Sequence, residues 1–212
     1  MQFIDLKSRH MLIGDKINAR IQNVMEHGQF ILGPEVRELE NKLAEYTGSK
    51  HCITVSSGTD SLLIALMALG VKAGDEVITV PYTWISSAEV IALLGAKPVF
   101  VDIRPDTWNM DDTLLEAAIS EKTKAIMPVS IYGQCSDMDA INTVAKEYNI
   151  PVIEDAAQSF GSILNNNISC SIGDFSTTSF FPTKSLGGYG DGGAIFTKKK
   201  NFLKKFKKIR QN

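Results

Sequence analysis

Long hydrophobic runs are absent from this chain of 212 residues. No apolar stretch approaches the roughly 18 residues that a membrane-spanning helix needs, and no secretory signal opens the sequence, so we expect no membrane insertion. Cysteine and histidine are scarce, with three of each, far apart and without CxxC pairs. Their spacing argues against a disulfide framework and against a metal centre. It favours a reducing compartment, which we expect to be the cytoplasm.

Two familiar phosphate-binding signatures are also missing. The chain has no GxxxxGK[ST] sequence, and no GxGxxG follows the first predicted strand. The net charge of −2 is unevenly placed, because residues 198–212 carry +8 and the remainder −10. Phe202, Phe206 and Ile209 recur there at helical spacing, which predicts an amphipathic connecting helix with one buried stripe. We expect no nucleic-acid binding, because the sequence offers no stacking platform of aromatic residues.

The remaining composition is that of a globular domain, with 44% apolar and 22% charged residues. Short apolar runs alternate with helical patterns, which predicts an α/β fold with a mostly parallel seven-stranded sheet between helices. The expected strands are Cys52–Val55, Val77–Val80, Pro98–Asp102, Ala125–Ser130, Pro151–Glu154, Phe175–Phe180 and Gly193–Thr197. The expected helices between them are Thr59–Leu69, Trp84–Leu94, Asp112–Ile119 and Asp137–Tyr148. A glycine-rich loop joins the last two strands, so one of these should run antiparallel, and residues 1–50 should form a helical arm.

Lys184 stands between the sixth expected strand and a loop with five glycines. A lysine beside buried structure is costly to keep charged, so its pKa should fall, and a neutral amine forms Schiff bases with carbonyl groups. A solvated loop lysine would have the same local sequence. This segment alone leaves both interpretations open.

Other chemically capable residues follow expected strands, where a parallel sheet binds its ligands. Ser57, Gly58 and Thr59 open a helix and offer N–H groups and hydroxyls to a phosphate, although an ordinary N-cap would look the same. Asp155 ends the Glu154-Asp155 pair, and Trp84 offers a flat face; a helix N-terminus and core packing are the respective alternatives. Together with a lysine, these groups match the needs of pyridoxal phosphate: a Schiff-base amine and an acid for the ring nitrogen.

The ordered set of motifs resembles the DegT/DnrJ/StrS family of sugar-nucleotide aminotransferases, which have the type I aminotransferase fold. The matching segments are Phe3–Leu6, Gly28–Val36, Ser57–Asp60, Gly74–Val77, Tyr132–Gln134, Glu154–Gln158 and Ser179–Gly193. Ser130–Cys135 and Ser179–Pro182 are most similar to the WbpE-type branch, which aminates a UDP-linked 3-oxo-N-acetylglucosaminuronate.

This resemblance implies roles for individual residues. Lys184 would form the Schiff base with pyridoxal phosphate and move protons during transamination, and Asp155 would pair with the ring nitrogen. The other implied cofactor contacts are Gln158 at the ring oxygen, Trp84 on the ring face, and Ser57, Gly58, Thr59 and Ser179 at the phosphate. The implied substrates are glutamate and a UDP- or dTDP-linked keto-sugar, used by a homodimer in surface polysaccharide (O-antigen) biosynthesis.

The resemblance also implies a division of the chain. Residues 51–197 would be the cofactor-binding large domain, and residues 198–212 the start of a helix leading to a small C-terminal domain that the sequence lacks. We therefore expect a fragment or truncated product, with an incomplete substrate site and a connecting helix without its packing partner. The alternatives are a 4-oxo-sugar aminotransferase and a non-catalytic scaffold or regulator. A related sugar dehydratase is disfavoured, because in that branch a histidine replaces the lysine.

Overall fold

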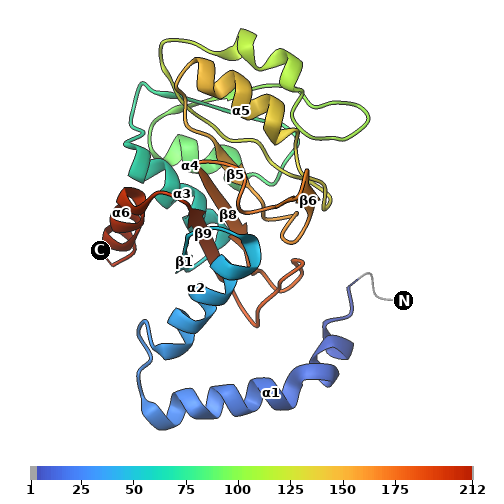
Figure 1. Ribbon diagram of the computed structural model, residues 1–212, viewed down its shortest axis with the longest axis vertical. Coiled ribbons are helices and arrows are strands. Elements are labelled where there is room, and N and C mark those ends of the chain that lie inside the picture. Colours follow the sequence, from blue (N-terminus) through green and yellow to red (C-terminus); the bar gives the residue numbers. More distant parts are fainter. Residues whose placement is uncertain (1–3, 212) are drawn as a thin grey trace.

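The computed structural model describes residues 4–211, and Figure 1 shows two N-terminal helices followed by a layered α/β body. The helices are α1 (Leu6–His27), α2 (Pro34–Thr47), α3 (Gly58–Leu69), α4 (Ser86–Leu93), α5 (Met138–Glu147) and α6 (Lys200–Arg210). The strands are β1 (His51–Val55), β2 (Glu76–Thr79), β3 (Lys97–Phe100), β4 (Thr123–Ile126), β5 (Ile153–Asp155), β6 (Ile163–Leu164), β7 (Asn167–Ile168), β8 (Phe175–Ser179) and β9 (Gly193–Thr197).

The seven strands expected from the sequence are all present and form one continuous surface. Two ladders, β3-β2-β4 and β1-β9-β8-β5, are joined by parallel bridges between Ile126 and Val152 and between Val129 and Asp155. In this seven-stranded surface β9 pairs antiparallel with β1 and β8, whereas the other strand pairs are parallel. The prediction of a mostly parallel sheet with one antiparallel strand is confirmed. A loop, which needs no crossover helix, joins β8 to β9 and permits their antiparallel pairing.

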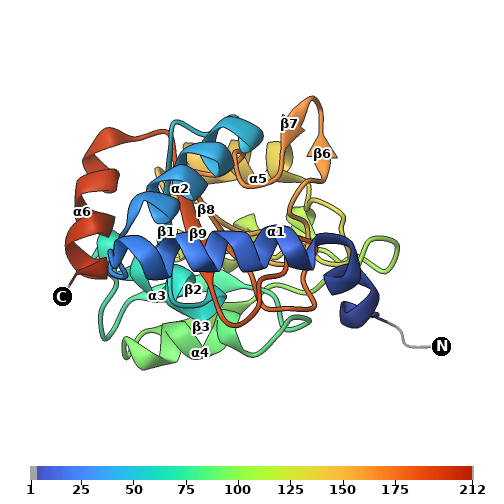
Figure 2. The ribbon, with the colours of Figure 1, turned by 90° about the horizontal axis from the view of Figure 1, so that it is seen from below.

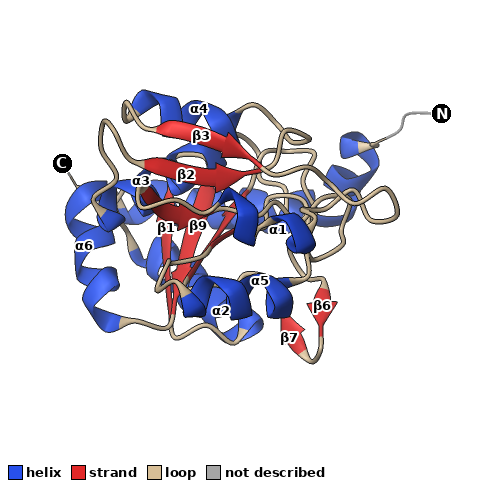
Figure 3. Ribbon diagram, turned by 90° about the horizontal axis from the view of Figure 1, so that it is seen from above, coloured by secondary structure: helices blue, strands red, loops and turns tan. Residues whose placement is uncertain are grey.

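Helices cover both faces of the sheet, as Figure 3 shows. Successive strand residues point to opposite faces, so Val77 packs in the cluster with α3, α4 and α6, while Ile78 packs in the cluster with α5. On the latter face α2 covers β1, with Leu43 in the same cluster as Cys52. This burial on both faces explains why the strands read as continuous apolar runs.

Helix α6 is packed onto the body rather than left without a partner. The rings of Phe202 and Phe206 lie 4.5 and 5.2 Å from that of Phe175, and Phe206 is fully buried. The Arg210 guanidinium contacts Glu40 at 2.6 Å in a largely buried ion pair. The predicted buried stripe is confirmed, and the expectation of a missing packing partner is wrong, because β8 supplies one.

Two local differences from the expected elements have simple causes. The segment Asp112–Ile119 forms two 3-10 turns, Asp112–Leu114 and Glu116–Ala118, instead of an α-helix, since its backbone hydrogen bonds close at i→i+3. The unexpected hairpin β6–β7 turns at Asn165 and Asn166, whose φ angles of 46° and 67° are those of a two-residue hairpin turn that asparagine tolerates.

Helix α1 lies away from the sheet, along the outside of the molecule (Figures 1 and 2). It exposes several large apolar side chains, among them Met11, Leu12 and Met25. Within residues 4–211, no helix combines the length and apolar character that crossing a membrane requires. The division into residues 1–50, 51–197 and 198–212 stays a prediction, and residues 1–3 and 212 lie outside the described part.

Candidate active site

The eight residues expected to form the site line one cavity of about 470 Å³ at the carboxyl ends of the parallel strands. This volume is within the usual range for a small-ligand pocket, roughly 300–1,000 Å³. The eight residues are Ser57, Gly58, Thr59, Trp84, Asp155, Gln158, Ser179 and Lys184. The fold thus brings together groups that are separated by up to 127 positions in the sequence.

The N-terminus of α3 forms one wall of the cavity. The Ser57 hydroxyl accepts a hydrogen bond from the Asp60 N–H at 3.0 Å, so Ser57 is an N-cap as well as a lining residue. The Thr59 and Ser86 hydroxyls are hydrogen-bonded at 2.8 Å. A Cβ on Gly58 would meet the Cβ of Ser179 at 2.6 Å, so the glycine permits the close approach of α3 to the end of β8. Free helix N–H groups and hydroxyls converge here as an anion requires.

Asp155 ends β5 with its carboxyl group buried at the cavity wall. The Ser87 hydroxyl donates to Oδ2 at 3.0 Å, and the Ala157 N–H donates to Oδ1 at 3.2 Å. Burial raises the pKa of Asp155, and these two hydrogen bonds and the charge of Lys184 oppose that rise. A carboxylate in this setting is a strong acceptor for a protonated nitrogen of a heterocycle.

Lys184 is half-buried on the loop between β8 and β9. Burial lowers the pKa of its amine, and the nearby charge of Asp155 partly opposes this. Among the described residues, none is hydrogen-bonded to the amine of Lys184. An amine that lines a cavity and has a lowered pKa has the chemistry of a nucleophile, and Lys184 forms no ion pair with the described residues.

The loop that carries Lys184 is fastened by α1, a contact that the sequence did not suggest. Arg9 donates from its guanidinium to the carbonyls of Pro182 at 2.9 Å and Gly187 at 3.4 Å. His10 lies beside Tyr189, with Nδ1 and Oη 2.7 Å apart. These contacts span more than 170 residues in sequence, so no local pattern could have indicated them.

The remaining expected residues are resolved differently. Trp84 is 74% exposed, which rules out the core-packing interpretation, and Gln158 is an exposed lining residue.

Glu154 points away from the cavity: its carboxylate is fully buried and accepts hydrogen bonds from the Ser169 and Ser176 hydroxyls, each at 2.7 Å. Burial raises the pKa of Glu154. The Glu154-Asp155 pair therefore supplies one structural and one site-facing carboxylate.

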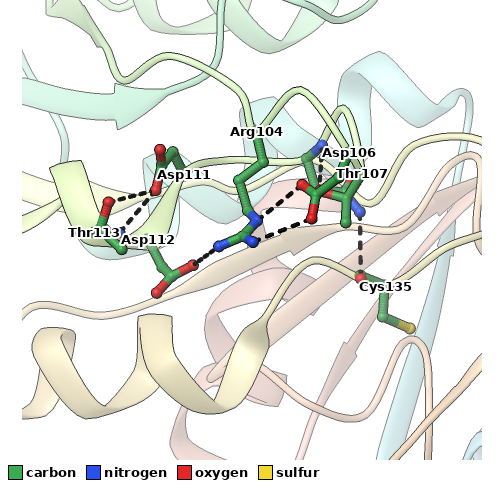
Figure 4. A network of polar contacts seen from close by, with 8 residues as sticks. Arg104, Asp106, Thr107, Asp111, Asp112, Thr113 and Cys135 are labelled. Atoms are coloured by element: carbon green, nitrogen blue, oxygen red, sulfur yellow. Dashed lines mark hydrogen bonds and ion pairs between the residues drawn. The ribbon is translucent and has the colours of Figure 1, made fainter.

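A clamp around Asn109 holds two loops next to the cavity. The buried Asn109 amide donates to the carbonyls of Gln134 and Cys135 and accepts the N–H of the lining residue Ile131. Figure 4 shows the polar network on the same loop, in which Arg104 contacts Asp106 and Asp112. The clamp supports a cluster of exposed aromatic rings, Tyr82, Trp108 and Tyr132, of which the last two have left-handed φ angles of 63° and 55°.

The sheet order and the cavity at its strand ends define the class of this molecule: a large α/β domain of the type I aminotransferase fold. The chain belongs to the DegT/DnrJ/EryC1/StrS aminotransferase family, whose sequence model matches residues 11–212.

Individual relatives are similar along nearly all of the chain. It is 61% identical to a UDP-2-acetamido-2-deoxy-3-oxo-D-glucuronate aminotransferase of Pseudomonas aeruginosa, over 93% of this chain and 55% of the relative. A DegT/DnrJ/EryC1/StrS aminotransferase structure from Brucella abortus superposes with a TM-score of 0.96 and 42% identity, over 99% of this chain and 58% of that one. The structure of NtdA from Bacillus subtilis with bound cofactor PMP superposes with a TM-score of 0.84 and 37% identity, over 91% of this chain and 43% of that one. The chain thus spans about half the length of these relatives.

Proposed function

We propose that this chain carries the cofactor-binding half of a pyridoxal-phosphate-dependent sugar-nucleotide aminotransferase. The observation that carries the proposal is the placement of half-buried Lys184 and buried Asp155 in one cavity, opposite the N-terminus of α3. The PMP in the related NtdA structure supports the same cofactor here.

The residues present fit the cofactor by their chemistry. Asp155 offers a buried carboxylate to a protonated ring nitrogen, and Trp84 offers an exposed flat face to the ring. The N–H groups at the start of α3, together with the hydroxyls of Ser57, Thr59 and Ser179, suit a phosphate. When bound, pyridoxal phosphate supplies an aldehyde for an amine and a ring that delocalises negative charge.

The chain's own groups then divide the work. Lys184 would hold the cofactor covalently, and its neutral amine, when free, would accept and return the proton at the substrate Cα. Its lowered pKa favours this exchange, because the amine is a base only when it is unprotonated. Asp155 would keep the ring nitrogen protonated, and Gln158, which lines the same cavity, would contact the ring oxygen. Burial around Asp155 excludes water that would weaken this charge pairing.

Glutamate is the proposed amino donor, and a UDP-linked 3-oxo-uronate sugar is the proposed acceptor. The name of the 61% identical relative supports the acceptor. A 4-oxo-sugar nucleotide is the alternative, and the cofactor residues are common to both. Assembly as a homodimer, supported by the exposed apolar side chains of α1, stays a prediction, as do the cytoplasmic location and the role in surface polysaccharide synthesis.

The two half-reactions test the proposal separately. Protein loaded with pyridoxal phosphate is incubated with glutamate, and we expect one equivalent of 2-oxoglutarate and conversion of the cofactor to its amine form. A 3-oxo and a 4-oxo UDP-sugar are then offered, and the aminated carbon is located by NMR. Lys184→Ala is the control and should give neither product. Bound cofactor that never reacts with glutamate would contradict catalysis and favour a scaffold.

A further inference from the structure

The segment Thr83–Ser87, which runs from the loop after β2 into the first turn of α4, contacts the candidate cofactor site on three sides. Trp84 lines the cavity, and the Ser86 hydroxyl is bonded to Thr59 in the N-terminal turn of α3. The Ser87 hydroxyl donates to Asp155 Oδ2 at 3.0 Å. One short segment thus touches groups that would hold the ring face, the phosphate and the ring nitrogen.

The direction of the hydrogen bonds at Ser87 follows from counting protons. A carboxylate only accepts, so the single hydroxyl hydrogen of Ser87 is directed to Asp155. The Thr83 hydroxyl, 3.1 Å from that of Ser87, must therefore be the donor to Ser87. A chain of three groups results, in which Thr83 donates to Ser87 and Ser87 donates to Asp155.

We propose that Ser87, oriented by Thr83, is a positioning residue that fixes the Asp155 carboxylate and keeps the proton on the ring nitrogen of the bound cofactor. This inference rests on the proposed function and assigns a part of the site that no sequence motif indicated.

The buried position of Ser87 allows its hydroxyl to fix the orientation of the Asp155 carboxylate. Its side chain is only 1% exposed, so water could not easily replace the hydroxyl. With Ala157 N–H on Oδ1 and Ser87 on Oδ2, both oxygens are held and the carboxyl plane cannot rotate freely. The lone pairs that remain can accept a ring N–H.

The hydrogen bond from Ser87 also affects where the proton between Asp155 and the cofactor's ring nitrogen resides. Donation to a carboxylate stabilises its charged form and makes it a weaker base. A weaker base leaves the proton on the ring nitrogen, whereas loss of Ser87 would move it toward Asp155. A hydrogen bond to a charged group supports roughly a tenfold change in this proton equilibrium.

The test uses pyridoxal phosphate labelled with ¹⁵N in the ring and reads the ring-nitrogen chemical shift by NMR. Ser87→Ala should move the shift from the protonated toward the neutral pyridine position, and Thr83→Val should move it the same way by less. Ser136→Ala is the matched control, because Ser136 is also buried but lies outside the cavity lining, and its hydroxyl donates to the backbone carbonyl of Val129. It should leave the shift unchanged.

The outcomes separate this inference from the function on which it rests. Wild-type protein that binds no cofactor would contradict both. Wild-type protein with bound cofactor, together with unchanged shifts in both variants, would overturn the role of Ser87 alone. If Ser87→Ala does not fold, Thr83→Val decides, since it removes only the donor that orients Ser87.

Discussion

Gly58 and Ser179 approach so closely that a Cβ on Gly58 would lie 2.6 Å from the Cβ of Ser179. Such contacts are essentially never seen between real side chains, so α3 and β8 are held at a distance that only glycine permits here. We predict that Gly58→Ala lowers the free energy of unfolding by about 1–3 kcal/mol, as overpacking does. It should also weaken pyridoxal phosphate binding, because α3 must shift. Thermal unfolding with and without cofactor measures both.

A double variant provides the control. Ser179→Gly removes the atom that the new methyl group meets, so Gly58→Ala/Ser179→Gly should recover part of the lost unfolding free energy. Purely additive losses would show that the two residues do not compete for space. Cofactor affinity should not recover, since Ser179 itself is a proposed phosphate contact.

The amine of Lys184 should titrate below 10.5, the ordinary value for lysine, in protein without cofactor. Burial lowers this pKa and the charge of Asp155 raises it, so Asp155→Asn should lower it further. Competitive acetylation over a range of pH, read by mass spectrometry, gives the midpoint, with exposed Lys146 as a check on the reagent. A Lys184 midpoint at or above 10.5 would rule out the buried-amine account.

The pKa shifts of Lys184 and Asp155 have opposite effects on how the free energy of unfolding depends on pH. The pKa of Lys184 is lowered on folding, so the unfolded chain binds more protons between the lowered value and 10.5, and the free energy of unfolding rises with pH there. The pKa of Asp155 is raised from 3.8, so the folded chain binds more protons just above 3.8, and the free energy of unfolding falls as pH rises there. Asp155→Asn should abolish the acid effect.

Glu154 should matter for stability and not for cofactor chemistry. Its carboxylate accepts from Ser169, Ser176 and the Cys170 N–H. Glu154→Leu would leave the Ser176 hydroxyl and the Cys170 N–H unpaired, whereas the Ser169 hydroxyl keeps its hydrogen bond to Ser159. Each unpaired buried donor costs about 1–3 kcal/mol, so urea denaturation should show a large loss. Glu154→Gln is the matched control and should lose less, because its amide nitrogen can donate to a serine hydroxyl. Equal stabilities for the two variants would contradict this assignment.

Arg9 should restrain the loop that carries Lys184. Arg9→Ala removes the donors to the Pro182 and Gly187 carbonyls, each part-buried. We expect the Gly188 amide, which bonds the Phe180 carbonyl, to exchange hydrogen roughly tenfold faster, since a charged hydrogen bond contributes about 1.5–3 kcal/mol. Hydrogen-exchange mass spectrometry of residues 180–192 measures this. Arg20→Ala, on the same helix but paired with Glu38, should leave that loop unchanged.

The sequence predicted the elements and site residues whose signals are local. Buried strands such as Val77–Val80 and the lysine beside a glycine loop were recognisable because burial and turn chemistry leave local signals. The Asn165-Asn166 pair carries the same kind of local turn signal. Ser87 was missed because a serine near the start of a helix looks ordinary, and its role depends on Asp155, 68 positions away. Arg9 was missed because its contacts are set entirely by the fold.

The central claim is that Lys184 binds pyridoxal phosphate covalently in the cavity it shares with Asp155. Borohydride reduction of the cofactor-loaded protein, followed by peptide mass mapping, tests it most directly. We expect one equivalent of reduced cofactor on the peptide containing Lys184, and none on Lys184→Ala protein, while Lys198→Ala labels normally. Label spread over surface lysines, or equal labelling of Lys184→Ala protein, would contradict the account.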